Sequence, residues 1–224
     1  MIAALYYYVL ARENIYTNMV PKKTFTDYLR LWFKWVLDPL GRFFNRLGLT
    51  PNMMTMVGLA GNTVGAYFLS QGNFLVGGLL VLIMTPIDAL DGTMARLRGE
   101  SSDFGAFVDS VSDRYSELII YGGLLYYFLS IGNPIGGLIT YTAAAGSILV
   151  SYVKSRAETL GYTAKIGILS RAERYLVLAP SLVLTYWIPN FVYIGLGIIA
   201  IFANITALQR IWHVRAQFHA KMNK

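Results

Sequence analysis

Six long apolar segments make up most of this chain and limit what it can fold into. Each is about as long as a helix that crosses the hydrocarbon core of a bilayer. Inside that core only helices and closed barrels satisfy their backbone polar groups, and 55% hydrophobic content is high for a soluble domain. We therefore predict an all-α integral membrane protein with six transmembrane helices, at about residues 54–71, 74–97, 105–130, 135–157, 173–188 and 190–212.

A basic amphipathic segment, residues 27–48, precedes these spans. Its aromatic and aliphatic residues fall on one helical stripe and its arginines and lysines on the other side, with a break at Asp38-Pro39. We predict a juxtamembrane helix on the cytoplasmic face, and the alternative is a soluble helix packed on another domain. Residues 1–26 are expected to form an interfacial or poorly ordered extension, residues 49–215 one six-helix domain, and residues 216–224 a basic tail.

Charge is distributed unevenly between the loops. The turns at residues 71–73, 131–134 and 187–190 carry none, whereas lysines and arginines gather in the segments that would face the other side. The positive-inside rule then places both termini and the charged loops in the cytoplasm, with the protein in the cell membrane. The formal net charge of +7 is thus a topology signal, and we expect no nucleic-acid partner.

Four aspartates lie in an otherwise apolar setting near the cytoplasmic ends of the second and third spans. Asp88 and Asp91 are three residues apart, and Asp109 and Asp113 are four apart, so each pair shares one helix face. Carboxylates packed together in a low-dielectric environment need cations to stay charged, and hard oxygen ligands favour magnesium, manganese or calcium over zinc. We predict a metal site formed by all four, and the alternative is a set of charges capping helix ends at the membrane surface.

The residues around these aspartates form a longer pattern. Residues 88–113 read D-x-x-D-G-x-x-A-R, eight residues, then G-x-x-x-D-x-x-x-D. This resembles the signature of the CDP-alcohol phosphotransferase family. The resemblance implies a transferase that moves the lipid phosphatidyl group of CDP-diacylglycerol, or its CDP-archaeol equivalent, to an alcohol and releases CMP. It also implies two Mg²⁺ or Mn²⁺ ions, Asp113 as the general base on the acceptor hydroxyl, and a homodimer.

The same resemblance assigns residues to the CDP-lipid donor. It implies nucleotide contacts by Gly92 and Arg96, by Ser102 on the loop, and by Asn52 and Thr55 at the start of the first span, where Asn52 is also the expected cap. Two further small residues, Ala95 and Gly105, would let a flat ligand or a second helix approach the backbone. We include them in the donor site.

Basic residues gather between the fourth and fifth spans and near the end of the sixth. Lys154, Arg171, Arg174 and Arg210 could form an anion site for a phosphate-bearing acceptor, although an ordinary positive-inside loop has the same composition. The segments YVKSRAE and SRAER, with a late Gln-Arg pair, are similar to the phosphatidylinositol-phosphate synthase branch of the family. That similarity implies that Lys154, Arg174 and Arg210 bind the phosphate of inositol phosphate. The branch often has proline where Ala172 stands.

Two alternatives stay open at the level of sequence. The acceptor could be another alcohol, such as glycerol 3-phosphate, and loss of Lys154 or Arg174 should be tolerated only if the acceptor carries no phosphate. Intramembrane carboxylates also mark cation paths, so a cation transporter is the alternative from another class.

Overall fold

The structure, a computed structural model, describes residues 25–100 and 102–222. Within these ranges it contains helices and no strand. The chain divides into two units, residues 1–34 and 35–224, and the helices from residue 51 onward belong to the second. Residues 1–24 of the predicted N-terminal extension lie outside the described residues. The helices are α2 (Phe25–Arg46), α3 (Pro51–Ser70), α4 (Phe74–Arg98), α5 (Asp103–Ser130), α6 (Pro134–Thr159), α7 (Arg171–Leu184) and α8 (Phe191–Met222).

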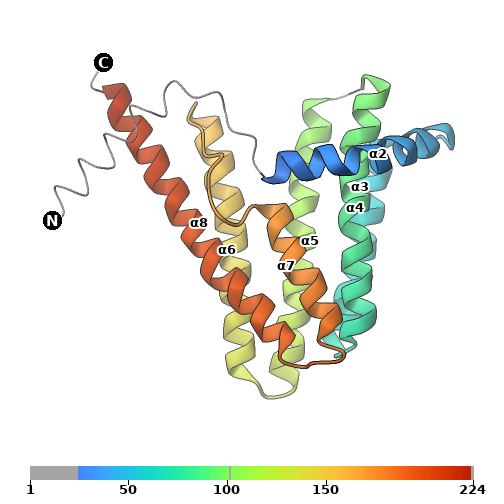
Figure 1. Ribbon diagram of the computed structural model, residues 1–224, viewed down its shortest axis with the longest axis vertical. Coiled ribbons are helices and arrows are strands. Elements are labelled where there is room, and N and C mark those ends of the chain that lie inside the picture. Colours follow the sequence, from blue (N-terminus) through green and yellow to red (C-terminus); the bar gives the residue numbers. More distant parts are fainter. Residues whose placement is uncertain (1–24, 101, 223–224) are drawn as a thin grey trace. The chain divides into compact units, whose positions relative to one another are not determined.

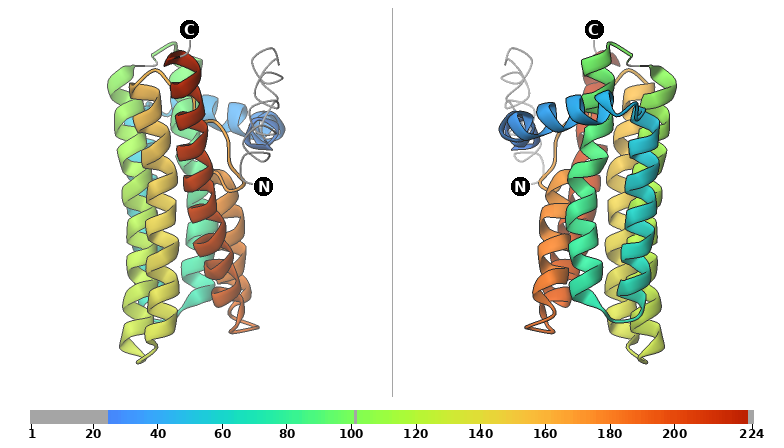
Figure 2. Two further views of the ribbon diagram at one scale, coloured as in Figure 1. Left: turned by 90° about the vertical axis from the view of Figure 1, so that its left-hand side faces the viewer. Right: turned by 90° about the vertical axis from the view of Figure 1, so that its right-hand side faces the viewer.

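Each predicted apolar segment forms one helix, and these helices run alongside one another as a bundle (Figure 1). Helix α3 packs against α4 and α5, α6 packs against α5 and α8, and α7 packs against α4 and α8 (Figure 2). At Gly123, an added Cβ would lie 2.4 Å from the backbone oxygen of Ala66, so α5 approaches α3 backbone to backbone. Small residues at such contacts let membrane helices pack closely.

Two of the uncharged turns share one construction. Gly72 and Gly132 have positive φ angles of 77° and 68°, and the asparagine that follows each glycine caps the next helix. The Asn73 side chain accepts from the backbone N–H of Val76 at 3.2 Å, and Asn133 does the same for Gly136 at 2.9 Å. A left-handed glycine followed by an N-cap explains why these short uncharged segments reverse the chain.

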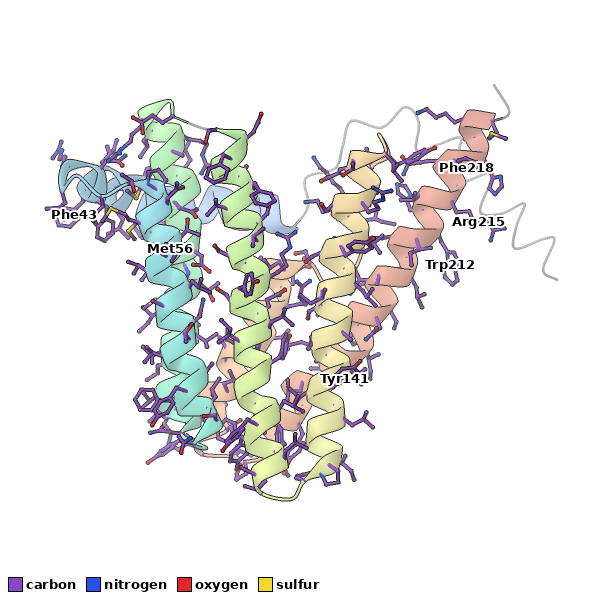
Figure 3. All side chains as sticks on the ribbon, turned by 180° about the vertical axis from the view of Figure 1, so that it is seen from behind. Phe43, Met56, Tyr141, Trp212, Arg215 and Phe218 are labelled. Carbon is purple, nitrogen blue, oxygen red and sulfur yellow. The ribbon has the colours of Figure 1, made fainter. Side chains whose placement is uncertain are left out.

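Three helices in the described part of the chain, α4, α6 and α8, are long and apolar enough to cross a membrane. Large apolar and aromatic side chains also point outward from the bundle, among them Met56, Tyr141 and Trp212 (Figure 3). Their outward position suits a surface covered by lipid acyl chains. The described helices are thus those of a multi-pass membrane protein.

The structure corrects two details of the predicted boundaries. Helix α2 continues through Pro39 without the expected break, and the segment after it is held against α4, where an added Cβ at Gly41 would lie 3.2 Å from Leu97. Helix α3 is capped by Thr50, whose hydroxyl accepts from Met53, and not by Asn52. In addition, helix α8 continues to Met222, so most of the expected basic tail is helical.

Candidate active site

The aspartates of α4 are held by the neighbouring helix α3. Asp91 is buried, and its Oδ2 accepts a 2.6 Å hydrogen bond from the hydroxyl of Thr55, while its Oδ1 accepts from the backbone N–H of Gly92. Asp88, one turn earlier, is also buried and lies against Gly58 of α3. A Cβ at Gly58 would lie only 1.7 Å from the Asp88 Oδ1 atom, so this glycine creates the space that the carboxylate fills.

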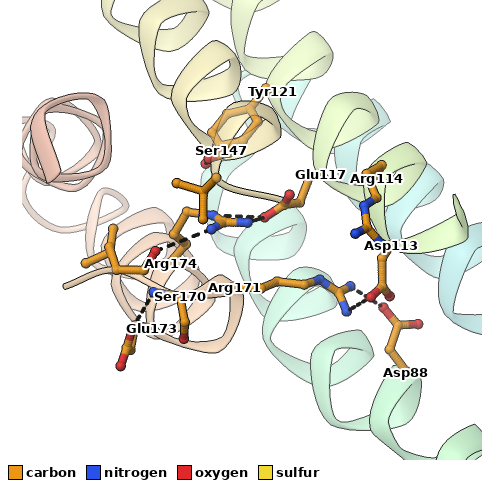
Figure 4. A network of polar contacts seen from close by, with 12 residues as sticks. Asp88, Asp113, Arg114, Glu117, Tyr121, Ser147, Ser170, Arg171, Glu173 and Arg174 are labelled. Carbon is orange, nitrogen blue, oxygen red and sulfur yellow. Dashed lines mark hydrogen bonds and ion pairs between the residues drawn. The ribbon is translucent and has the colours of Figure 1, made fainter. Parts of the chain in front are cut away.

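The aspartates of α5 are half-buried and lie across from α4. Arg171, the first residue of α7, connects the two groups: its Nη2 atom lies 3.4 Å from Oδ2 of Asp88, and its Nη1 atom pairs with Asp113 (Figure 4). Asp88 also lies close enough to Asp91 and Asp109 for their charges to interact. The charges of Asp113 and Asp109 interact in the same way. All four predicted carboxylates therefore belong to one electrostatic cluster.

The four carboxylates do not converge on a single point. Among the residues that the structure describes, no group of three or more acidic or histidine side chains is close enough to ligate one metal ion. The guanidinium of Arg171 stands between Asp88 and Asp113 instead. The metal site inferred from the sequence therefore stays a prediction.

The composition of the cluster nevertheless fits a divalent cation. Its donors are all carboxylate oxygens, the set that magnesium and manganese prefer. Four carboxylates face two arginines, Arg171 and Arg114, and Arg114 donates to the backbone carbonyl of Ser110. Negative charge thus exceeds positive charge in a largely buried place, where a further cation would be stabilising.

The residues assigned to the donor lie at two places beside the aspartates. Thr55 and Gly92 contact Asp91 directly, and a Cβ at Gly92 would meet only the Arg96 guanidinium, at 3.6 Å. Asn52 and Ser102 meet at Gly105, where an added Cβ would lie 4.0 Å and 3.2 Å from their side-chain oxygens.

Local hydrogen bonds help to position the residues assigned to the CDP-lipid donor. Ser102 caps α5 by accepting from the Gly105 N–H at 3.0 Å. Arg96 is exposed and donates to Thr93 at 3.0 Å, and Ala95 is half-buried one turn past Asp91. These residues therefore lie at the N-terminal ends of α3 and α5 and in the last turns of α4.

The predicted acceptor cations are mostly engaged with protein groups. Arg174 is almost fully buried, and its Nε and Nη2 atoms donate to Oε1 of Glu117 at 3.1 and 2.7 Å (Figure 4). Arg210 donates to the backbone oxygens of Ile166 at 2.8 Å and Val150 at 2.7 Å. It also lies within electrostatic range of Arg174.

Local structure explains how these cations reach the interior. A capping box between Ser170 and Glu173 begins α7, so Arg171 and Arg174 project from its first turns toward α5 (Figure 4). Lys154 is half-buried on α6, one turn past Val150, whose carbonyl Arg210 binds. The guanidiniums of Arg174 on α7 and Arg210 on α8 therefore lie near each other, and Arg210 lies close to the turn of α6 that carries Lys154.

Two site residues were missed in the sequence. Glu117 follows Asp113 by four residues, so it continues the i, i+4 series of Asp109 and Asp113 along α5. Extending that spacing by one step would have found it. Gly58 could not be found in this way, because nothing in the sequence shows that it faces Asp88.

The geometry defines a helical membrane protein with an acidic cluster opposite buried arginines, and comparison with known proteins gives its family. A sequence model of the family described as CDP-alcohol phosphatidyltransferase matches residues 48–212. The chain belongs to this family of enzymes. The transporter alternative is therefore wrong.

Relatives with known names are similar over nearly their whole length. Phosphatidylinositol phosphate synthase of Streptomyces avermitilis is 32% identical over 223 residues, covering 93% of this chain and 90% of that protein. Archaetidylinositol phosphate synthase of Pyrococcus horikoshii is 33% identical over 180 residues, covering 80% and 90%.

A solved structure has the same fold. The crystal structure of Mycobacterium tuberculosis phosphatidylinositol phosphate synthase with CDP-DAG bound matches with a TM-score of 0.75 and 29% identity, covering 80% of this chain and 93% of that one. The same enzyme in complex with manganese and citrate matches with a TM-score of 0.74, covering 80% and 88%.

Proposed function

We propose that this protein transfers the phosphatidyl group of a CDP-linked lipid to the hydroxyl of inositol phosphate and releases CMP. The observation that carries the proposal is Arg171, which joins the aspartates of the family motif to the basic first turn of α7. Donor-side carboxylates and acceptor-side cations are thereby neighbours. The named relatives, which include phosphatidylinositol and archaetidylinositol phosphate synthases, support the acceptor.

The donor would be held by the acidic cluster and the small residues beside it. Asp88, Asp91, Asp109 and Asp113 would ligate divalent metal, with two Mg²⁺ or Mn²⁺ ions as the proposed number. When bound, the metal neutralises the pyrophosphate and the CMP that leaves. Gly92 leaves room for the nucleotide, and Thr55 keeps the Asp91 carboxylate in one orientation. Asn52, Ala95, Arg96, Ser102 and Gly105 complete the proposed donor site.

The acceptor phosphate would bind among Lys154, Arg171, Arg174 and Arg210. Arg174 and Arg210 lie within range of mutual repulsion although both are buried. Glu117 compensates only one of these two charges, so a further anion beside them would be stabilising, and guanidinium forks suit phosphate. A phosphate-bearing alcohol fits this arrangement better than a neutral one.

The reaction would be a direct displacement at phosphorus. The acceptor hydroxyl oxygen forms a bond to the phosphorus that carries the lipid, and the bond from that phosphorus to the CMP oxygen breaks. Asp113 accepts the hydroxyl proton, and the CMP phosphate leaves with the electron pair. Arg171, already beside Asp113, would orient the acceptor toward this base.

The wider setting belongs to the same proposal. We place six spans at α3–α8, the amphipathic α2 on the cytoplasmic face, and the active site and both termini in the cytoplasm, in the cell membrane. A homodimer and either an ester-linked or an ether-linked donor lipid are also expected. The uncharged turns at Gly72 and Gly132 would face the opposite side.

The direct test is an acceptor panel with product identification by mass. Purified protein in detergent is incubated with CDP-diacylglycerol, or with CDP-archaeol, and Mg²⁺, together with inositol phosphate, inositol, glycerol 3-phosphate or serine. We expect CMP release only when the acceptor is inositol phosphate. The lipid product should be phosphatidylinositol phosphate from CDP-diacylglycerol, or its archaeol counterpart from CDP-archaeol. CMP release with another acceptor and none with inositol phosphate would contradict the proposed acceptor.

A further inference from the structure

The ion pair between Glu117 and Arg174 connects two helices that each pack mainly on other partners. Helix α5 packs against α3 and α6, and α7 packs against α4 and α8. Asp113 and Glu117 are one turn apart on α5, and Arg171 and Arg174 are one turn apart on α7. The result is two parallel ion pairs across the interior, Asp113 with Arg171 and Glu117 with Arg174 (Figure 4).

The two ion pairs differ in burial. The Arg171 and Asp113 side chains are 31% and 14% exposed, whereas Arg174 and Glu117 are 1% and 4% exposed. Glu117 takes the Nε and Nη2 atoms of Arg174, which leaves Nη1 with only a long 3.4 Å contact to the Leu169 carbonyl. A guanidinium held along one edge keeps its other edge in a fixed direction.

A buried ion pair is weak evidence of a stabilising role. Removing both charges from a buried pair and replacing them with apolar side chains of similar volume is often neutral or stabilising. The neighbouring polar groups also support a defined geometry: Tyr121, one turn beyond Glu117, shares a 3.1 Å hydrogen bond with Ser147 of α6. Both partners of that bond are buried.

We infer that Glu117 is a positioning residue for acceptor binding, whose carboxylate fixes the Arg174 guanidinium so that Nη1, which has only the long contact to Leu169, can turn to the acceptor phosphate. This inference rests on the proposed function, because Arg174 matters only if the acceptor carries a phosphate. Glu117 does not touch the reacting atoms. Its effect should appear in the use of the acceptor and not in the use of the donor.

The test compares the Michaelis constants of both substrates in Glu117→Asp, which keeps the charge but shortens its reach. We expect the KM for inositol phosphate to rise about 10- to 100-fold, as befits a misaligned charged hydrogen bond. The KM for CDP-diacylglycerol should stay within about twofold, and kcat at saturating acceptor close to wild type. Glu100→Asp is the control, because Glu100 is an exposed carboxylate paired with Arg98 at 3.7 Å.

A double variant, Glu117→Met with Arg174→Met, tests whether the pair serves acceptor binding at all, if Glu117→Asp fails to fold. It removes both buried charges together, so the helices should still pack. We expect folded protein with the same large rise in the acceptor KM. A wild-type acceptor KM in either variant would overturn the inference and leave the pair a purely structural link between α5 and α7.

Failure of the proposed function would be distinguishable. It would appear as no CMP release by the wild type with inositol phosphate, whatever the variants do. Binding of inorganic phosphate, measured by calorimetry on the wild type and Glu117→Asp, tests the inference independently. Weaker phosphate binding in the variant supports it, and unchanged binding overturns it.

Discussion

The hydroxyl of Thr55 on α3 donates a 2.6 Å hydrogen bond to Oδ2 of Asp91 on α4, and both residues are buried. The Oδ1 atom of the same carboxylate accepts from the backbone N–H of Gly92. One carboxylate is therefore fixed from two sides before any ligand binds. Its orientation belongs to the packing of α3 on α4 and not to α4 alone.

Thr55→Val should lower activity while the fold is kept. The substitution retains the shape of the side chain and removes the hydrogen bond, whose loss beside a buried charge costs about 1.5–3 kcal/mol. We expect kcat/KM for CMP release to fall about 10- to 100-fold, with Thr55→Ser near the wild type. Equal activity of the valine and serine variants would show that this hydrogen bond does not orient Asp91 for the reaction.

Gly58→Ala should displace the Asp88 carboxylate. The added Cβ would lie 1.7 Å from its Oδ1 atom, whereas a Cβ at Gly122 of α5 would meet nothing within 4 Å. Gly122→Ala is therefore the matched control. We expect the Gly58 variant to lose at least about 100-fold in kcat/KM, because misplacement of about 1 Å at a reacting centre has effects of that size. Unaltered activity in Gly58→Ala would show that Asp88 needs no fixed position.

Asp91→Asn and Asp109→Asn should each abolish product formation in protein that still folds. An amide has the shape of the carboxylate but supplies no negative charge for a divalent cation. Asp103→Asn, an exposed position in the first turn of α5, is the control and should stay active. Circular dichroism and elution volume would check the fold, and near-normal CMP release by either Asp91→Asn or Asp109→Asn would contradict the metal site.

Metal should compensate for the loss of Arg171. The Arg171 guanidinium pairs with both Asp88 and Asp113, so Arg171→Met should lower the Tm by several degrees, as removal of a partner from a largely buried pair does. Saturating Mg²⁺ should narrow the difference between variant and wild type, because it neutralises the same carboxylates. A thermal scan with chelator and with Mg²⁺ measures this, and an equal Tm difference in both would argue that metal binds elsewhere.

Much of the helical framework could be predicted because hydropathy and turn signals are local. The six apolar segments gave six helices, and Asn73 caps the second of them at the turn expected there. The cap of α3 was also within reach: Pro51 favours the first helical position, which points to Thr50 and not Asn52. The continuity of α2 through Pro39 could not be predicted, because the residues just after the proline contact α4, and the sequence does not show that contact.

The pairings within the site could not be predicted, because they join helices far apart in the chain. Arg174 and Glu117 are 57 residues apart, and Arg171 and Asp88 are 83 apart. Periodicity shows which side chains share a helix face, as for Asp109 and Asp113, but it does not show which helix that face meets. The sequence therefore predicted a cluster of acids and a cluster of cations, and only the structure shows that Arg171 and Arg174 reach the acids.

Aspartates of α4 and α5 are expected to bind divalent metal beside the arginines of α7. Anomalous diffraction from crystals grown with Mn²⁺ tests this most directly. We predict anomalous peaks between Asp88, Asp91, Asp109 and Asp113, with the Arg171 guanidinium moved away from Asp88. Peaks absent from this place, in protein that makes product with the same Mn²⁺, would contradict it.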